Sequence, residues 1–243
     1  MADAIRLDNV RFSFSGVPLL KGVSFSVERG GMFAVAGQSG CGKTTLLEIC
    51  SSLRAPQDGA VFWDGINVGA LTHAGLMRAR QQIGYVFQKH ALIHNFTVFD
   101  NIALPLRYHR HMAEREVRPA VHECMEELGL FNVDKRFPNE LSAAQSRCAA
   151  IARAVIMGPS LLFLDEPTAG VDPITAASIG SVLRDLNANR RITMAMICNN
   201  VDVLRILSCP VAVLDNGNLF DYRDPAAAVQ GVESMFTVLR KSL

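Results

Sequence analysis

The chain has 243 residues, with 24 Lys and Arg against 23 Asp and Glu, so its formal net charge is +1. That balance offers no electrostatic basis for binding nucleic acid, which we therefore do not expect as a partner. Hydrophobic residues make up 49% and charged residues 19% of the chain. This composition excludes a disordered protein and is typical of a globular α/β fold.

Neither a secretory signal nor a membrane span is expected. The first residues, MADAIRLD, contain no basic segment and no continuous apolar stretch. The longest apolar runs, such as LLFL at 161–164, are far shorter than the ~18 residues of a spanning helix. The six cysteines form no C-x-x-C pair and are expected to be reduced thiols. We therefore expect a cytoplasmic chain.

The first part of the chain has strand patterns. Residues 5–27 alternate apolar and polar side chains in two segments around the turn-like SGVP, which predicts an antiparallel β-sheet. The apolar run at 32–37 predicts a strand ending in a tight loop, and the pattern at 44–53 predicts the helix that follows. Further strands are expected at 60–68, around an Asp-Gly turn, and in IGYVFQ, which ends at Gln88.

Helical patterns then replace the strand patterns from 89 to 157, which predicts an inserted α-helical subdomain. Strand patterns return in SLLFLDEP, ITMAMIC and VAVLDNG, and they alternate with helices near 174–187 and 201–206. Such alternation predicts a parallel sheet. An amphipathic helix is expected at 225–243. We predict an α/β fold with one domain over residues 1–243.

A phosphate-binding loop is predicted in GQSGCGKT, which fits G-x-x-x-x-G-K-[ST] between a predicted strand and a predicted helix. Its glycines let successive backbone N–H groups point at phosphate oxygens beside the helix N-terminus. Lys43 is expected to reach the β- and γ-phosphates of ATP, and the Thr44 hydroxyl to hold Mg²⁺. The alternative, a glycine-rich turn with an incidental lysine, is disfavoured by the flanking elements. The residues expected to contact the nucleotide here are Gly37, Gln38, Ser39, Gly40, Cys41, Gly42, Lys43, Thr44 and Thr45.

Two acidic residues follow an apolar strand pattern in LLFLDEP at 161–167. Charges at such a position are costly unless they bind a partner. Asp165 is predicted to support Mg²⁺, and Glu166 to polarise a water for attack on the γ-phosphate. The alternative is a strand that ends in solvated charges, and the phosphate-binding loop upstream disfavours it.

In order and spacing, the phosphate loop, Gln88, LSAAQ at 141–145 and LDEP at 164–167 resemble the ATPases of ATP-binding-cassette (ABC) transporters. The resemblance covers nearly the whole chain and implies a P-loop NTPase core. It also implies a head-to-tail dimer with a second ABC ATPase chain, identical or different, in which each ATP lies between one phosphate loop and the opposite signature motif. Integral membrane permease subunits would be partners, on the inner face of the plasma membrane.

The resemblance assigns further residues. Phe14 matches the aromatic residue that stacks on adenine, and Asp172 matches the loop that contacts the opposite site. Gln88 matches the residue that links Mg²⁺ and the attacking water to the permease. Residues 89–157 match the subdomain that docks on the transporter. The signature residues expected at the partner's nucleotide are Ser142, Ala143, Ala144 and Gln145.

Two departures from the family pattern bear on hydrolysis. Ala143 and Ala144 replace the signature glycines, and each added Cβ stands where the family's backbone approaches the γ-phosphate. Ser142 and Gln145 also fit a helix capping box, so a purely structural interpretation is open. Asn199 stands in place of the family's histidine and can still donate a hydrogen bond, although it does not titrate.

The main hypothesis is the ATP-hydrolysing motor of a membrane transporter. ALIHNFTVFDNIALPLR and AGVDPITAASI resemble the ATPases of mammalian-cell-entry (Mce) type lipid transporters, which implies lipids as cargo, although methionine-importer ATPases share much of the first segment. One alternative is a catalytically weakened subunit of a heterodimeric or regulatory complex. Another is a soluble ABC ATPase of repair or translation, disfavoured because those usually carry long insertions or paired domains.

Overall fold

This computed structural model describes residues 3–89 and 91–222.

The N-terminal part of the chain folds as a four-stranded antiparallel sheet. The Asp64–Gly65 turn has positive φ at both residues, 49° and 80°, as Asp-Gly hairpin turns require. In spatial order the strands are β2 (Val17–Glu28), β1 (Asp3–Phe14), β4 (Asp58–Trp63) and β5 (Ile66–Asn67).

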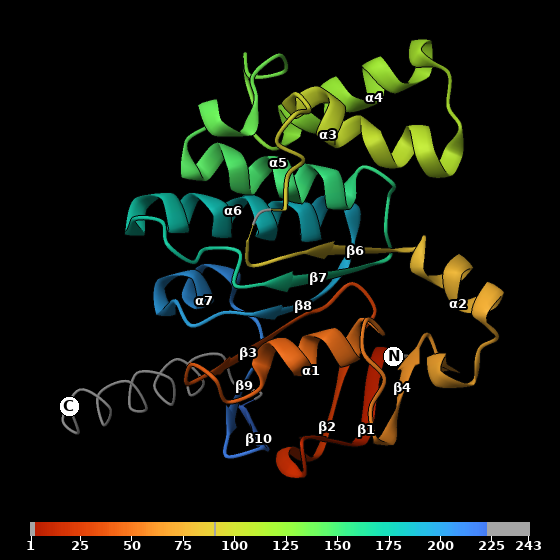
Figure 1. Cartoon of the computed structure of the whole chain (residues 1–243). Coiled ribbons are helices and arrows are strands. Elements are labelled where there is room, and N and C mark those ends of the chain that lie inside the picture. Colours follow the sequence, from red (N-terminus) through yellow and green to blue (C-terminus); the bar gives the residue numbers. More distant parts are fainter. Residues whose placement is uncertain (1–2, 90, 223–243) are drawn as a thin grey trace.

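A six-stranded sheet forms the centre of the molecule (Figure 1). Its neighbouring strands run parallel, except that the edge strand β10 is antiparallel to β9. In spatial order the strands are β10 (Asn218–Tyr222), β9 (Val211–Asp215), β3 (Met32–Gly37), β8 (Thr193–Ile197), β7 (Leu161–Asp165) and β6 (Ile83–Val86). One expectation was wrong: β6 ends at Val86, so Gln88 lies in the loop that follows and not at the strand end.

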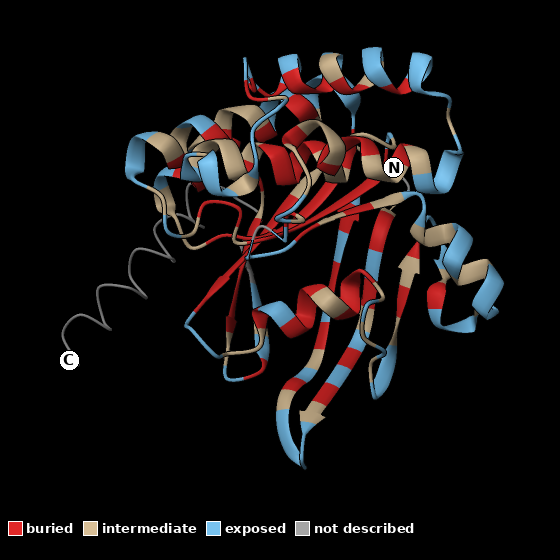
Figure 2. Ribbon diagram, turned by 45° about the horizontal axis from the view of Figure 1, so that its top comes forward, coloured by how far each residue is buried: buried red, intermediate tan, exposed pale blue. Residues whose placement is uncertain are grey.

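Helices cover both faces of this parallel sheet. The helix after the phosphate loop, α1, shares a buried cluster with one face of the sheet and with the antiparallel sheet, whereas α3 to α7 contribute to the cluster on the other face. Strands β7 and β8 are buried along their whole length and appear solid red in Figure 2, as expected for strands covered on both sides. The helices are α1 (Lys43–Cys50), α2 (His73–Arg80), α3 (Val98–Pro105), α4 (Glu114–Glu127), α5 (Ala143–Val155), α6 (Pro173–Arg190) and α7 (Val201–Leu207).

Consecutive strand residues divide between the two clusters. Phe163 packs on the α1 side, while its neighbours Leu162 and Leu164 pack on the other side. This division follows from the two-residue period of a strand. The described residues 91–157 contain helices and no strand, so the inserted helical region is confirmed. In Figure 1, α3 and α4 form its outer layer, while α5 lies nearer the sheet.

The described part of the helical region shares its core with the parallel sheet. Its buried residues belong to the same cluster as the upper face of the parallel sheet and α6. The extent of the single domain, 1–243, stays a prediction, and the helix expected at 225–243 lies outside the described residues. In the part of the chain that the structure describes, no helix has the length and apolar character needed to cross a membrane.

Candidate nucleotide site

The loop between β3 and α1 has a backbone that requires glycine at two positions. Gly37 has φ 156°, and a Cβ there would lie 2.5 Å from the carbonyl oxygen of Leu214. Gly42, the N-cap of α1, has φ 106°, and its Cβ would lie 2.9 Å from Leu19 Cγ. The loop is therefore curled against the sheet and opens onto the N-terminus of α1, which is the geometry of an anion-binding site.

Lys43 folds back over this loop. Its side chain is buried, and Nζ donates to the carbonyl oxygens of Gly37 at 2.8 Å and of Gln38 at 2.7 Å. These carbonyls satisfy the ammonium group, and a phosphate in the loop would present a negatively charged alternative within reach of the same group. Ser39 and Gly40 are exposed at the loop surface.

Cys41 and Thr45 differ in their surroundings. Cys41 is half-buried, and burial raises the pKa of its thiol although the charge of Lys43 acts to lower it. Thr45 is buried in the first turn of α1. A ligand in the loop would therefore meet Cys41 before Thr45.

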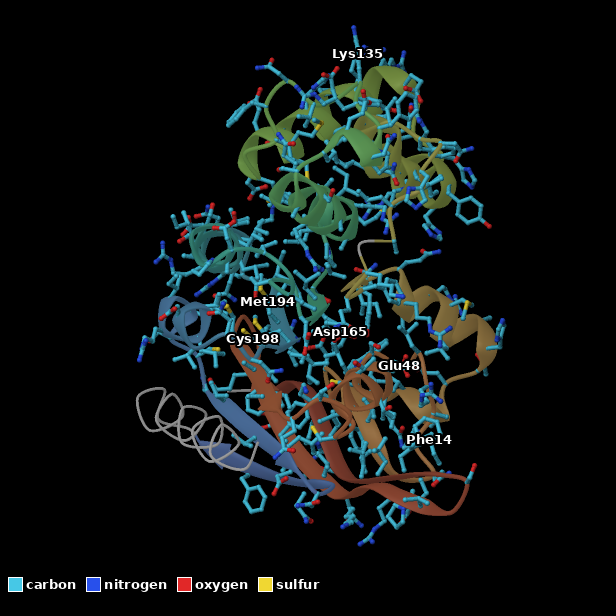
Figure 3. All side chains as sticks on the ribbon, turned by 60° about the vertical axis from the view of Figure 1, so that its left-hand side comes forward. Phe14, Glu48, Lys135, Asp165, Met194 and Cys198 are labelled. Atoms are coloured by element: carbon cyan, nitrogen blue, oxygen red, sulfur yellow. The ribbon has the colours of Figure 1, made fainter. Side chains whose placement is uncertain are left out.

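Asp165 is a buried carboxylate at the end of β7, near the centre of the molecule in Figure 3. Thr44 Oγ1 donates to its Oδ1 at 3.5 Å. Burial is the main cause that raises the pKa of Asp165, and the negative charge of Glu166 adds to it. Two hard oxygen ligands side by side, one of them a desolvated carboxylate, fit Mg²⁺. Thr44 and Asp165 could therefore hold that ion.

Glu166 lies between two amide side chains. Gln88 Nε2 donates to its Oε2 at 3.0 Å, and Asn199 Nδ2 donates to its Oε1 at 3.2 Å. Each carboxylate oxygen keeps a further lone pair that can accept from a water. The structure thus brings together the three residues predicted to be catalytic.

The backbone at Glu166 is strained. Its φ is 47°, in the left-handed region, and its N–H donates to the carbonyl of Ile197 at 3.1 Å. Such a conformation costs roughly 1–2 kcal/mol for a residue with a Cβ, and strain of this kind clusters at functional sites. The turn directs the carboxylate toward Gln88 and Asn199.

Asn199 also contacts the phosphate loop. Its Oδ1 accepts the N–H of Gly37 at 3.0 Å while its Nδ2 donates to Glu166. The sequence predicted a donor at this position. The acceptor half of the contact, which joins the phosphate loop to Glu166, was missed because it depends on the pairing of β3 with β8.

The signature residues form a capping box at the start of α5. Ser142 Oγ accepts the N–H of Gln145 at 3.2 Å, and the N–H of Ser142 donates to Gln145 Oε1 at 3.0 Å. Ala143 is exposed and Ala144 half-buried. The capping interpretation is confirmed, and no hydrogen bond described for residues 3–89 and 91–222 joins this motif to the phosphate loop of its own chain.

Asp172 and Phe14 lie at the surface. Asp172 is the N-cap of α6, and its carboxylate accepts from the Thr175 N–H at 3.0 Å and from Thr175 Oγ1 at 2.5 Å. These bonds lower the pKa of Asp172. Phe14 is exposed near the outer end of the antiparallel sheet (Figure 3), with its ring edge-on to Phe12 at 5.0 Å between centroids. The roles of Asp172 and Phe14 stay predictions.

Two buried polar residues near the site were missed. Asn101 on α3 accepts the Ile93 N–H at 2.7 Å and donates to the Ile93 carbonyl at 3.1 Å, which fixes the loop after Gln88. Arg147 on α5 is 4% exposed and contacts two loops of the site. A lone polar residue on the apolar face of each helix is the signal that could have found them.

Comparison with known families identifies the class. A family model described as "ABC transporter" matches residues 20–169, so the chain belongs to the ABC transporter family. The methionine import ATP-binding protein MetN of Rhizobium meliloti is 39% identical over 225 residues, covering 90% of this chain and 63% of that protein. MetN 1 of Pseudomonas syringae is 37% identical over 206 residues, covering 85% and 62%. The chain thus spans less than two thirds of the length of these relatives.

Solved structures agree with the fold. The dimeric ABC transporter cassette MJ0796 has a TM-score of 0.80 at 31% identity, covering 88% of this chain and 96% of that one. CbiO1 of Clostridium perfringens, part of the transporter complex cbiONQ, has a TM-score of 0.85 at 26% identity, covering 99% and 94%. The expected α/β fold is confirmed. The expected likeness to Mce-type lipid ATPases is not supported, because the relatives are named for methionine import.

Proposed function

We propose that this chain is the ATP-binding and ATP-hydrolysing subunit that powers a membrane importer. The observation that carries the proposal is the placement of Glu166 beside the phosphate loop, with one amide donor on each carboxylate oxygen. If Glu166 only stabilised the fold, it would not need an amide donor on each of its two oxygens. The family membership supports the same function.

Each residue of the site has a distinct role in the proposal. The loop amides and Lys43 bind the phosphates of ATP, and Lys43 exchanges its carbonyl partners for phosphate oxygens. Thr44 and Asp165, with Gln88, would hold Mg²⁺, which when bound supplies positive charge at the phosphate oxygens. Glu166 accepts a proton from a water held in line with the γ-phosphate. Orientation of the Glu166 carboxylate by its two amide partners pre-positions that proton acceptor.

The partners follow from the arrangement of the motifs. Ser142 to Gln145 contact one another and not the phosphate loop of the same chain, which supports a second ATPase chain whose nucleotide faces this motif. MJ0796, whose structure is described as dimeric, supports the same arrangement. Permease subunits are proposed to dock on the helical region and hold the chain at the inner face of the plasma membrane.

A small amino acid of the methionine class is the cargo that we propose in place of lipid. The support is the identity of 37–39% to proteins named for methionine import. The test is whether a complex reconstituted in vesicles couples ATP turnover to uptake of labelled methionine. Turnover without methionine uptake would exclude this cargo and leave the motor function intact.

A weakened subunit is the second candidate, and Ala143 and Ala144 are the observation that favours it. Both carry a Cβ at the start of α5, where the family has glycine. If this chain pairs with a standard partner, its own Glu166 would meet an unaltered signature, while LSAAQ would serve the other site. Asn199 weighs against this candidate, because it still contacts both Gly37 and Glu166.

Turnover of Mg-ATP decides between the two candidates. The full complex, purified with its membrane subunits, is compared with the Glu166→Gln variant, which keeps the size of the side chain and one of the two acceptor oxygens and removes the proton acceptor. A rate at least about 100-fold above that variant is expected for a motor. A rate equal to that of the variant, with ATP still bound, would mean that this chain contributes ATP-driven closure of the dimer and no hydrolysis at its own site.

A further inference from the structure

Arg147 is a buried arginine of α5 that contacts the loops of the candidate site. It lies one turn after the signature residues, and its side chain is 4% exposed. Its guanidinium donates through Nη1 to the carbonyl of Gln88 at 2.7 Å and through Nη2 to the carbonyl of Ala169 at 2.6 Å. Nε has no hydrogen-bond partner.

The two carbonyls belong to the two loops that carry the proposed catalytic groups. Gln88 itself donates to Glu166. Ala169 closes the turn after Glu166, since its N–H donates to the Glu166 carbonyl at 3.0 Å. Asp172 follows three residues later. One guanidinium therefore fixes the backbone on both sides of the Gln88–Glu166 contact.

The partners of Arg147 are unusual for a buried charge. No carboxylate forms an ion pair with it among the described residues, and burial lowers the pKa of its guanidinium while the charge of Glu166 opposes that shift. Burying a charge against backbone carbonyls alone is costly, and a packed apolar side chain would avoid the cost. The fork geometry of arginine is what spans two carbonyls at once.

We infer that Arg147 is a positioning residue that couples the signature helix to the Gln88 and Glu166 loops. The inference rests on the proposed hydrolytic function. Because Ser142 caps the helix that carries Arg147, a shift of α5 caused by a nucleotide at the signature motif reaches both loops through one guanidinium. The position of Glu166 then depends on the contact at the signature motif.

The test compares Arg147→Met with wild type in the full complex. Loss of both hydrogen bonds is expected to lower kcat about 10-fold to 100-fold, because a shift of the order of 1 Å in a catalytic group has an effect of that size. KM for ATP is expected to change less than about 3-fold, since Arg147 donates to the loops after Gln88 and Glu166 and, among the described residues, no hydrogen bond joins it to the phosphate loop. Arg147→Lys keeps the positive charge but lacks the forked guanidinium. Its kcat is expected to lie between those of wild type and Arg147→Met.

Hydrogen exchange gives a readout that does not require turnover. In Arg147→Met the amides of 87–89, of Glu166 and of 168–171 are expected to exchange faster, whereas those of 37–45 are not. If the wild type shows no turnover above Glu166→Gln, the proposed function fails, yet the exchange pattern still tests the positioning by Arg147. Exchange unchanged in both loops would overturn the inference.

Arg190→Met is the matched control. Arg190 on α6 also donates to a carbonyl of α5, that of Val155 at 3.2 Å, and to Glu127, away from both loops. The Arg190→Met variant is expected to have a lower melting temperature and a kcat within about 2-fold of the wild-type value. If Arg147→Met and Arg147→Lys likewise lower the melting temperature and leave kcat of the folded complex unchanged, Arg147 is only structural and the inference is wrong.

Discussion

Asn199 makes two contacts at the candidate site. It accepts from the phosphate loop and donates to Glu166 at once. An amide can do both in a single protonation state, whereas an imidazole does so only when neutral. Asn199 therefore makes both contacts without adding a titratable group to the site.

Asn199→Ala is expected to lower kcat about 10-fold to 100-fold, because Glu166 loses one of its two anchors. Asn199→His restores a donor and an acceptor while the ring is neutral. Its turnover is expected to fall below about pH 6.5, as the ring protonates and can no longer accept from Gly37. The measurement is the pH profile of ATP turnover for all three proteins. A wild-type profile with the same fall would contradict this account.

Cys41 lies inside the phosphate loop, and alkylation there is expected to be blocked by saturating ATP. Burial raises the pKa of the thiol, so labelling at pH 7 should be slower than for a free cysteine, and the labelling rate should still increase with pH above the ordinary thiol pKa of about 8.5. Mass spectrometry of labelled peptides measures both effects. Cys41→Ser is the control, and labelling of Cys41 that ATP does not change would rule out a nucleotide in this loop.

At the scale of elements, the start of α5 combines a stabilising cap with a departure from the family motif. The box between Ser142 and Gln145 begins the helix, and alanine favours the helix over glycine. The helix therefore tolerates LSAAQ well, and any cost falls on the contact with a partner's nucleotide. Glycine at positions 143 and 144 should therefore lower the stability of the protein and raise its ATP turnover.

The variant Ala143→Gly, Ala144→Gly is expected to lower the free energy of unfolding by up to about 1 kcal/mol per site. Turnover of the complex is expected to rise, because the backbone can approach the γ-phosphate more closely. Chemical denaturation and ATPase rates measure the two effects. Ala149→Gly, inside the same helix and buried, is the control for lost helix stability without gained activity.

The helical region carries its own charge network. Arg107 donates to Asp100 at 2.9 Å and to Glu114 at 2.5 Å, and Thr97 caps α3 beside them. The hydrogen bond from Thr97 is the largest cause that lowers the pKa of Asp100, followed by the bond from Arg107. The network thus joins the start of α3 to the start of α4.

Asp100→Asn is expected to destabilise the protein at neutral pH by roughly 1 kcal/mol or less, since the pair is partly exposed. A lowered carboxyl pKa gives stability that is present above the unfolded pKa, near 3.9, and is lost as pH falls through the folded value. The difference between wild type and variant should therefore shrink below about pH 4. Urea denaturation between pH 3 and 7 measures it, and a difference that grew on acidification would contradict the assignment.

At the scale of the whole molecule, nucleotide binding should stabilise the fold, because the phosphate loop lies between the two sheets that make the core. ATP at 100 times its Kd adds about 2.7 kcal/mol to the free energy of unfolding, so the melting temperature should rise. Lys43→Ala is expected to abolish that rise with little change in the absence of ATP. A rise that survives this substitution would place the nucleotide elsewhere.

Most of the fold was predictable because its signals are local. The period of two in β1 and β2, the continuous apolar runs of β7 and β8 and the Asp64–Gly65 turn each specify one element within a few residues of sequence. The end of β6 was not predictable. Phe87 and Gln88 continue the strand pattern, but β7 offers β6 backbone partners only as far as Val86.

The sequence by itself determined the phosphate loop and the acidic pair, because the chemistry of each lies in consecutive residues. Only the tertiary structure decided that Gln88 and Asn199 meet at Glu166, and that Arg147 contacts the loops that carry Gln88 and Glu166. Gln88 is 78 residues from Glu166 along the chain and Asn199 is 33 residues from it. Such contacts exist only once parallel strands β6, β7 and β8 pair side by side, because pairing brings the carboxyl ends of separate strands to one edge of the sheet.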